Sequence, residues 1–256
     1  MKARLLGRLV AGALAGTVAT VTGQALYTVR RRDLPSVHGG DASGCEGRAG
    51  DTALSVIACG DSTLTGPGLD DPADIWIRQA LRSIAGKRSL RVELQSLAAG
   101  GSRLADVLRD QVPELQARSP SVAVIVAGTN DAINHTPLRI VRQSVDRLLA
   151  DAVPHVDQVV VGSVGDLANI ARVRWPLAGV LRLRGRRVDR AIRRVVARYP
   201  NVHYIDVSQT DRHFRHGGHT LFTSDRFHPN RDGHALWAEV AEPVIDAAIG
   251  AALTRR

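Results

Sequence analysis

The chain has 256 residues, of which 44% are hydrophobic and 23% are charged, a composition that excludes an intrinsically disordered protein. The formal net charge is +9, and residues 172–198 account for all of it, with ten arginines against one acid, Asp189. Because no recognised module and no interleaving of aromatic with basic residues accompanies this charge, we expect no nucleic-acid partner. Two cysteines are too few for a disulfide framework, and Cys59 is predicted to be a small core residue.

The N-terminus begins with the basic stretch MKARLLGR, and residues 9–29 then run without a charge up to three consecutive arginines. This length can span a bilayer core, although glycine and threonine make the segment only weakly apolar. We interpret residues 1–33 as a hydrophobic anchor, or alternatively as a signal peptide with a poor cleavage site at Gly23-Gln24-Ala25. The protein is therefore expected to be membrane-anchored or secreted. Positive charge at both ends leaves the side of the membrane unassigned.

Residues 34–50 are rich in Gly, Ser and Asp and show no periodicity, which predicts a linker to one domain over residues 51–256. Within that domain, apolar runs typical of buried strands alternate with helical patterns. The alternation predicts an α/β fold, a three-layer α/β/α sandwich with a mostly parallel five-stranded sheet. The strands are expected at 54–58, 91–97, 122–127, 156–164 and 202–207, and helices at 104–115, 140–152, 188–199 and 232–253.

A candidate nucleophile follows the first of these strands, in the sequence VIACGDSTLTG. The apolar run ends abruptly in Gly60-Asp61-Ser62, which predicts a strand that delivers one hydroxyl to a loop. By itself Ser62 could equally be the N-cap of the next helix. A serine nucleophile also needs a base, a group that orients the base, and donors for the developing oxyanion.

The base and its partner are found in the sequence SDRFHPN near the C-terminus. Asp225 and His228 are three residues apart in a predicted turn, so the carboxylate can hold one ring nitrogen while the other faces Ser62. His228 would then be the general base.

Oxyanion donors are expected after two further strands. The side-chain amide of Asn130 follows the strand at 122–127, and Gly101 is expected to open the helix after the second strand, where its N–H would favour an anion. Gly100 competes with Gly101 for this role, and the N–H of Ser62 would be the third donor. Asp61 and Asp131, beside these motifs, are interpreted as acceptors that brace the loops.

The blocks GDST, GGS, GTND and DRFHPN, in this order, resemble those of the SGNH hydrolase superfamily, also called GDSL-type lipases and esterases. The resemblance covers residues 54 to about 250. It implies a flavodoxin-like sandwich and carboxylic ester hydrolysis without a cofactor. It also implies Ser62 as nucleophile, His228 as base, Asp225 as the third triad member, and Gly101 and Asn130 in the oxyanion hole. Thr63 stands where the name-giving members have leucine.

The expected function is therefore a serine esterase acting on a small-molecule or lipid ester through an acyl-enzyme on Ser62. An acyltransferase or deacetylase acting on sugar hydroxyls would use the same triad, and a non-catalytic binding module of the cell envelope is a further alternative. The sequence assigns neither the acyl length nor the oligomeric state.

Two other clusters have less specific interpretations. The three histidines of HFRHGGH, before the acid–base pair, are expected to lie in a loop, and no metal site is predicted because no carboxylate or cysteine completes the set. The arginine-rich stretch 172–198 is either a solvated helix face or a basic surface that contacts anionic lipid headgroups or attracts anionic substrates.

Overall fold

The computed structural model of the chain describes residues 16–17, 19–24 and 39–255. Most of the predicted anchor, residues 1–33, therefore lies outside the described residues. Within the described ranges, no helix combines the length and the apolar character needed to cross a membrane.

Six strands of the described chain form one sheet in the order β1-β3-β2-β4-β5-β6. All neighbouring strands are parallel except β1, which pairs antiparallel with β3. The five predicted strands are confirmed. Their mostly parallel pairing is also confirmed, and it was predicted from their continuous apolar character. The strands are β1 (Gly44–Glu46), β2 (Thr52–Gly60), β3 (Leu90–Ser96), β4 (Val122–Val126), β5 (Gln158–Gly162) and β6 (Val202–Ile205).

The sixth strand, β1, lies inside the segment 34–50 that was predicted to be a linker. Gly44 pairs with Leu94 of β3, and the neighbouring Ala42 is fully buried. The linker prediction was thus wrong for this part of the segment. Three residues are too few to show a strand periodicity, and the pairing depends on an edge of β3 that the local sequence does not reveal.

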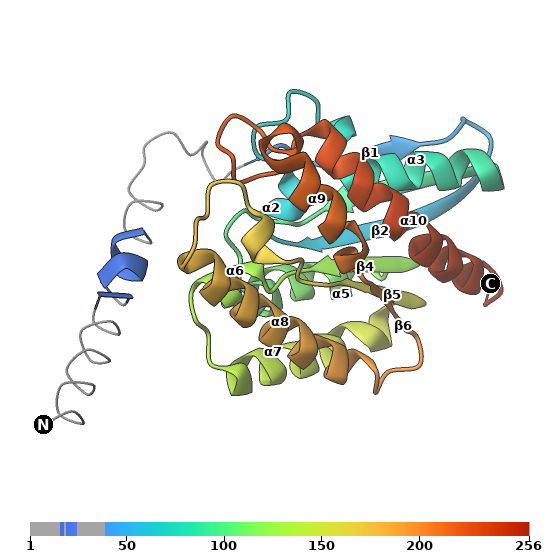
Figure 1. The fold of residues 1–256 in the computed structure, drawn as a ribbon. Coiled ribbons are helices and arrows are strands. Elements are labelled where there is room, and N and C mark those ends of the chain that lie inside the picture. The colour runs from blue at the N-terminus through green and yellow to red at the C-terminus, as the bar shows by residue number, and fades with distance from the viewer. Residues whose placement is uncertain (1–15, 18, 25–38, 256) are drawn as a thin grey trace, which may run out of the picture.

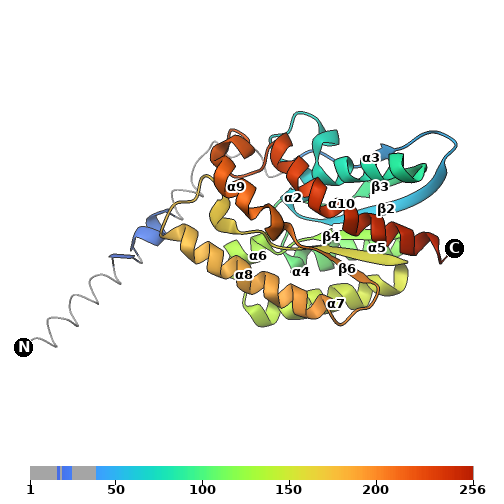
Figure 2. The same cartoon turned by 45° about the vertical axis from the view of Figure 1, so that its right-hand side comes forward.

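Helices cover both faces of the sheet, as the three-layer prediction required (Figure 1). On one face lie α3 (Trp76–Arg88) and α10 (Arg231–Leu253), and on the other lie α7 and α8 with the shorter α4 and α5, as the turned view also shows (Figure 2). The remaining bounds are α2 (Ser62–Thr65), α4 (Leu104–Asp106), α5 (Val112–Arg118), α6 (Thr129–Ile133), α7 (Leu138–Ala152), α8 (Leu177–Val196) and α9 (Asp211–Gly217).

Successive residues of the central strands enter different cores. In β2, Leu54 and Val56 pack in the core with α3 and α10, whereas Ile57 and Cys59 pack in the core with α7 and α8. Because both faces are covered, the strand reads as a continuous apolar run instead of an alternating one. Cys59 is fully buried, as predicted, and burial raises the pKa of its thiol to about 12.

The parallel strands bring their carboxyl ends to one edge of the sheet. Ser62 follows β2, Gly101 follows β3 and Asn130 follows β4. These three residues, which sequence analysis selected, therefore lie at the same edge, although up to about 70 residues separate them along the chain.

We expect Glu46→Ala to lower the free energy of unfolding by about 2 to 3 kcal/mol, because it removes the partner of a nearly buried arginine. The Glu46 carboxylate lies 2.7 Å from Arg78 Nε and 3.1 Å from Arg82 Nε. Urea unfolding followed by circular dichroism measures the change. The control, Glu93→Ala, breaks the exposed pair with Arg91 on β3 and should change the free energy by less than about 0.5 kcal/mol. Equal stability of the two variants would mean that β1 does not contribute to the domain.

Candidate active site

The turn after β2 presents Ser62 at the first position of α2. The residue that caps this helix is Asp61, whose carboxylate accepts a hydrogen bond from Thr63 N at 3.0 Å. The alternative that Ser62 is only an N-cap is therefore wrong, and its hydroxyl is left for another role. Gly60 is required just before the turn, because a Cβ at this position would lie 2.0 Å from the carbonyl oxygen of Val126 in β4.

Gln111, which sequence analysis did not select, holds Gly60 from the other side. Its Oε1 accepts from Gly60 N at 2.7 Å, its Nε2 donates to Gly60 O at 3.0 Å, and the same nitrogen lies 3.5 Å from Ser102 Oγ. Gln111 is buried in the π-helical turn Val107–Gln111, and such turns recur at functional sites. The available signal was a single amide on an otherwise apolar helix face, seven residues after Leu104.

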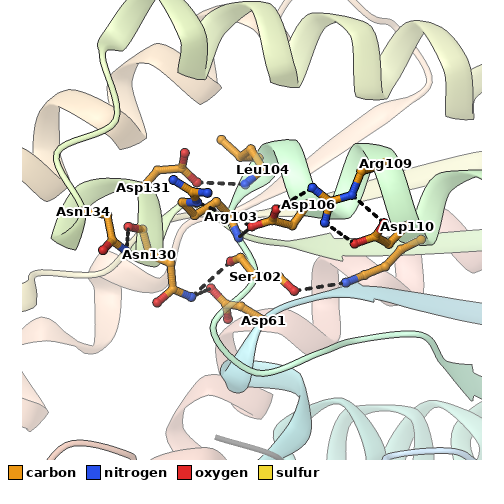
Figure 3. A network of polar contacts seen from close by, with 11 residues as sticks. Asp61, Ser102, Arg103, Leu104, Asp106, Arg109, Asp110, Asn130, Asp131 and Asn134 are labelled. Atoms are coloured by element: carbon orange, nitrogen blue, oxygen red, sulfur yellow. Dashed lines mark hydrogen bonds and ion pairs between the residues drawn. The ribbon is translucent and has the colours of Figure 1, made fainter.

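Asn130 joins the same network at the start of α6 (Figure 3). Its Nδ2 donates to Ser102 O at 3.1 Å and lies 3.4 Å from Asp61 Oδ2. Asp131, the next residue, accepts from Leu104 N at 2.9 Å. Asp61 and Asp131 thus brace the loops as hydrogen-bond acceptors, which is the role predicted for them.

The two bracing carboxylates are buried, and their acidity reflects it. Burial raises the pKa of Asp61 to about 6, although the hydrogen bonds from Thr63 and a protonated His228 would act in the opposite direction. Burial likewise raises the pKa of Asp131, against the hydrogen bond from Leu104 N. Both groups lie close to the turn that carries Ser62, so the site is a low-dielectric one.

Gly101 lies in a turn closed by a hydrogen bond from Ser102 N to Ala99 O at 3.2 Å. Its φ of +82° is in the left-handed region, which favours glycine at this position. Gly101 does not open the following helix, as was predicted, because α4 begins only at Leu104. Its position therefore comes from the turn, and the argument from the helix dipole was wrong. Neither the N–H of Gly101 nor that of Ser62 has an acceptor among the described residues.

Asp225 and His228 are paired in the predicted turn near the C-terminus. Asp225 Oδ2 lies 2.7 Å from His228 Nδ1, and Asp225 Oδ1 accepts hydrogen bonds from Thr223 Oγ1, Phe227 N and His228 N at 2.7 to 3.0 Å. Burial alone would raise the pKa of Asp225, but the hydrogen bond with His228 and those from the turn outweigh it and lower the pKa to about 2. The Asp225 carboxylate is therefore ionised at neutral pH and places a negative charge next to the His228 ring.

The same turn is attached to the loop between β5 and α8. Arg172 N donates to Arg226 O at 2.9 Å, and Arg172 Nη1 donates to Asp225 O at 3.0 Å. Arg226 has a φ of +57°, so this backbone position is strained for a residue with a side chain. The bonds from Arg172 hold the strained turn in place, and one arginine of the basic stretch thereby supports the site.

Ser62 and His228 line one cavity of about 110 Å³, which opens at the carboxyl edge of the sheet. Its wall is mostly apolar and comes from the ends of β4 and β6, the loop after β5, and the helices α9 and α10. Apolar lining residues include Val126, Leu167, Ile170, Ile205, Phe214 and Trp237. Gly101 and Asn130 are not part of this wall. Asn130 contacts Asp61, which precedes Ser62, and Ser102, which follows Gly101, is bonded to both Asn130 and Gln111.

His234, a second buried histidine near the site, was also missed by sequence analysis. Its Nδ1 accepts a hydrogen bond from Trp76 N at 3.2 Å, and the Trp76 indole donates to Thr63 O at 2.9 Å. Burial, reinforced by the proximity of His228, lowers the pKa of His234 to about 3, so the ring is neutral. His234 therefore supports the helix α2 through Trp76.

The three histidines of HFRHGGH belong mainly to α9 (Asp211–Gly217), so the prediction of a loop was wrong. Of His213, His216 and His219, the last follows α9 in a short 3₁₀ turn. In the part of the chain that the structure describes, no cluster of three or more His, Cys, Asp or Glu side chains forms a candidate metal site.

Comparison with known structures identifies the class of fold. The esterase EstA from a Pseudoalteromonas species is 14% identical with a TM-score of 0.61, over 77% of this chain and 99% of the other. A family 3 carbohydrate esterase of Clostridium thermocellum is also 14% identical with a TM-score of 0.61, over 78% and 100% of the two chains. At these identities the similarity shows the fold alone, a three-layer α/β/α sandwich with a mostly parallel sheet.

The sequence profile of the GDSL-like lipase/acylhydrolase family matches residues 58–236. The chain belongs to this family. It is also 30% identical over 193 residues to a protein named GDSL-like esterase Rv1075c from Mycobacterium tuberculosis. That match covers 73% of this chain, and this chain spans 60% of the length of the relative.

The low pKa of His234 predicts a specific loss of stability in acid. The unfolded state takes up a proton near pH 6.5 and the folded state only near pH 3, so stability falls as the pH decreases through this window. Between pH 7 and pH 5 this contribution amounts to about 2 kcal/mol. We expect His234→Gln to remove this contribution. The free energy of unfolding of the variant should then change less between pH 7 and pH 5 than that of the wild type, even where the two differ in stability at pH 7.

Urea unfolding of wild type and variant at both pH values measures the difference. The exposed His155 provides the matched control, since His155→Gln should retain the wild-type pH dependence. An unchanged pH dependence in His234→Gln would contradict the assignment of a neutral buried ring.

Proposed function

We propose that the protein is a serine esterase that hydrolyses carboxylic esters through an acyl-enzyme on Ser62. The observation that carries the proposal is that Ser62 and His228 line the same cavity, while Asp225 lies 2.7 Å behind the His228 ring. Membership in a family of lipases and acylhydrolases agrees with it. The name of the Mycobacterium tuberculosis relative also supports an esterase.

In the proposed reaction, His228 is the general base. Its Nδ1 donates to Asp225, which fixes the tautomer and leaves Nε2 unprotonated to accept the proton of Ser62 Oγ. The alkoxide-like oxygen attacks the ester carbonyl, and His228 then gives its proton to the departing alcohol. Water, activated by the same imidazole, hydrolyses the acyl-enzyme and restores Ser62. These steps use only protein groups and water.

The oxyanion would be stabilised by the N–H groups of Ser62 and Gly101 and by the amide of Asn130. Both N–H groups are without an acceptor among the described residues, so they are available to a ligand. One N–H of the Asn130 amide is committed to Ser102 O at 3.1 Å, whereas the contact with Asp61 is long, at 3.4 Å. The bond to Ser102 O keeps the amide oriented, and the second N–H, held only by the long contact with Asp61, is available to an oxyanion.

The cavity beside Ser62 favours a short acyl group. An engineered apolar cavity of about 150 Å³ accommodates benzene, and the volume here is about 110 Å³. The wall contains aromatic and aliphatic side chains such as Phe214, Trp237 and Ile205, which offer apolar contact to an acyl chain. We infer that the acyl chain enters this cavity and that the alcohol part of the ester remains outside it.

The first test is Ser62→Ala, which should reduce the hydrolysis of p-nitrophenyl butyrate by about 10⁴-fold or more, because the acyl-enzyme can no longer form. Circular dichroism should show an intact fold. The control is Ser208→Ala, which changes an exposed serine and should keep wild-type activity. If Ser62→Ala retained the activity of the control, Ser62 would not be the nucleophile.

A series of p-nitrophenyl esters from acetate to palmitate tests the acyl pocket. We expect kcat/KM to be highest for chains of about two to four carbons and to fall by roughly 10-fold or more at octanoate, because a longer chain exceeds the cavity. The leaving group is constant in the series, and Ser62→Ala gives the background rate. A maximum at palmitate would contradict the proposed use of this cavity.

A further inference from the structure

The outward face of α8 combines apolar side chains with arginines. Val180, Leu183, Arg187, Arg190 and Arg194 follow one another at intervals of three and four residues, so they form one stripe along the helix. All five are exposed. The stripe lies opposite the buried side of the helix, which carries Leu181, Val188, Ile192 and Val195.

The apolar residues at the start of α8 are unusual among the described residues because they are exposed. The large exposed hydrophobic residues of the described part of the chain are Trp175 at 79%, Leu183 at 52% and Val180 at 37% exposure, and all of them gather at the N-terminal end of α8. Single exposed apolar residues need no explanation, but three within nine residues of the chain suggest a surface that contacts a partner. We name Trp175, Val180, Leu183, Arg187, Arg190 and Arg194 the α8 surface.

The arginines of the α8 surface differ from four other arginines of the basic stretch, Arg182, Arg186, Arg193 and Arg198, which are paired with carboxylates. Arg182 pairs with Asp166 at 2.9 Å, Arg193 with Asp206 at 2.9 Å, and Arg198 with Asp146 at 3.1 Å. By contrast, Arg187, Arg190 and Arg194 form no ion pair with a carboxylate of the described residues. The positive charge of the stripe is therefore uncompensated by the fold.

A second observation connects the α8 surface to the N-terminal segment. The Gln24 side chain donates to Trp175 O at 3.0 Å and accepts from Leu177 N at 3.2 Å. Val21 packs against the core that contains α8, and the described N-terminal residues lie at the start of this helix (Figure 2). Both residues belong to the uncharged run 9–29. The described part of the uncharged run thus meets the domain at the end of α8 that exposes Trp175.

We propose that the α8 surface docks on an anionic lipid bilayer. Tryptophan is enriched at membrane interfaces, where its ring lies at the level of the headgroups, and Val180 and Leu183 would enter the boundary with the acyl chains. The three arginines would lie over anionic headgroups. Charge complementarity favours this occupant over a second copy of the chain, because two such surfaces would bring six arginines together.

The docked orientation also places the active-site cavity close to the bilayer. The loop that precedes Trp175 contributes Leu167, Asn169 and Ile170 to the wall of the cavity beside Ser62. An ester that leaves the bilayer at the α8 surface would therefore reach the cavity along this loop. The docking itself does not depend on the proposed esterase activity, since it needs neither Ser62 nor His228.

The experiment uses the full chain and the fluorescence of Trp175, which is far more exposed than the buried Trp76. Vesicles of phosphatidylglycerol or of phosphatidylcholine carry bromine on the upper acyl carbons, and Trp175→Phe provides the signal to subtract. We expect bromine to quench Trp175 on phosphatidylglycerol vesicles at low salt, and much less on phosphatidylcholine vesicles or at high salt. Because Gln24 of the N-terminal run bonds to Trp175 O, insertion of that run would bring Trp175 to either kind of vesicle, so the proposal is tested by the dependence of quenching on anionic lipid and on salt.

Two matched variants test the arginines. The combined change Arg187→Gln, Arg190→Gln and Arg194→Gln should raise the concentration of anionic lipid needed for half-maximal quenching by about 100-fold. The control replaces Arg139, Arg142 and Arg147 by glutamine, three exposed arginines of the neighbouring helix α7, and should leave that concentration within about threefold. A further variant, Leu183→Gln, should reduce the quenching and keeps the proposal testable if the triple variant does not fold.

The proposal is overturned if Trp175 is not quenched on anionic vesicles, or if the α7 and α8 triple variants lose quenching equally. Acrylamide quenching without lipid identifies the other occupants, since we expect Trp175 to be accessible in the free protein. Protection that increases with protein concentration would assign the surface to a second copy. Protection at every concentration would assign it to another segment of the same chain, and either result rejects the bilayer.

Discussion

The buried carboxylate of Asp61 connects the turn that carries Ser62 with the loop that carries Asn130. The rest of the candidate site depends on this connection. One oxygen caps α2 through Thr63 N, the other faces the Asn130 amide, and the main-chain N–H of Asp61 donates to Val126 O at 3.1 Å. A single residue thereby ties the turn after β2 to the end of β4. Burial raises its pKa to about 6, so the fold holds an ionised group at neutral pH against the cost of desolvation. Gln111 adds the bonds to Gly60 that keep this turn against the loop after β3.

The histidine side of the site is built separately. Asp225 and His228 are fixed by hydrogen bonds inside one short turn, which a small antiparallel bridge between Phe222 and Pro229 closes. Arg172 attaches the turn to the loop after β5. Ser62 and His228, the proposed nucleophile and base, thus come from two independently braced structures, and both line the apolar cavity. Such a division would allow the loops around the cavity to vary while Ser62 and His228 keep their positions.

Helix α8 packs against the core on one side and carries the proposed docking surface on the other. Its inner side contributes Val188 and Ile192 to the core, and this burial holds the helix on the sheet. The residues of its outer side are not needed for packing, so they can be selected for contact with a partner. We infer that the high positive charge of the chain reflects this second use, since charge placed on a solvated face contributes little to stability.

The sequence by itself determined the alternation of strands and helices, the mostly parallel sheet covered on both faces, and the residues that reach one edge of it. Continuous apolar runs and helical spacings are local signals, and parallel strands necessarily bring Ser62, Gly101 and Asn130 to the same edge. Only the tertiary structure decided that β1 belongs to the sheet, that Asp61 and not Ser62 caps α2, and that Gln111 and His234 support the site. Each of these depends on a hydrogen-bond partner that is distant in the chain, such as Gly60 for Gln111 and Trp76 for His234. Whether a buried polar side chain is satisfied is a property of the packed fold, and no local pattern of residues contains it.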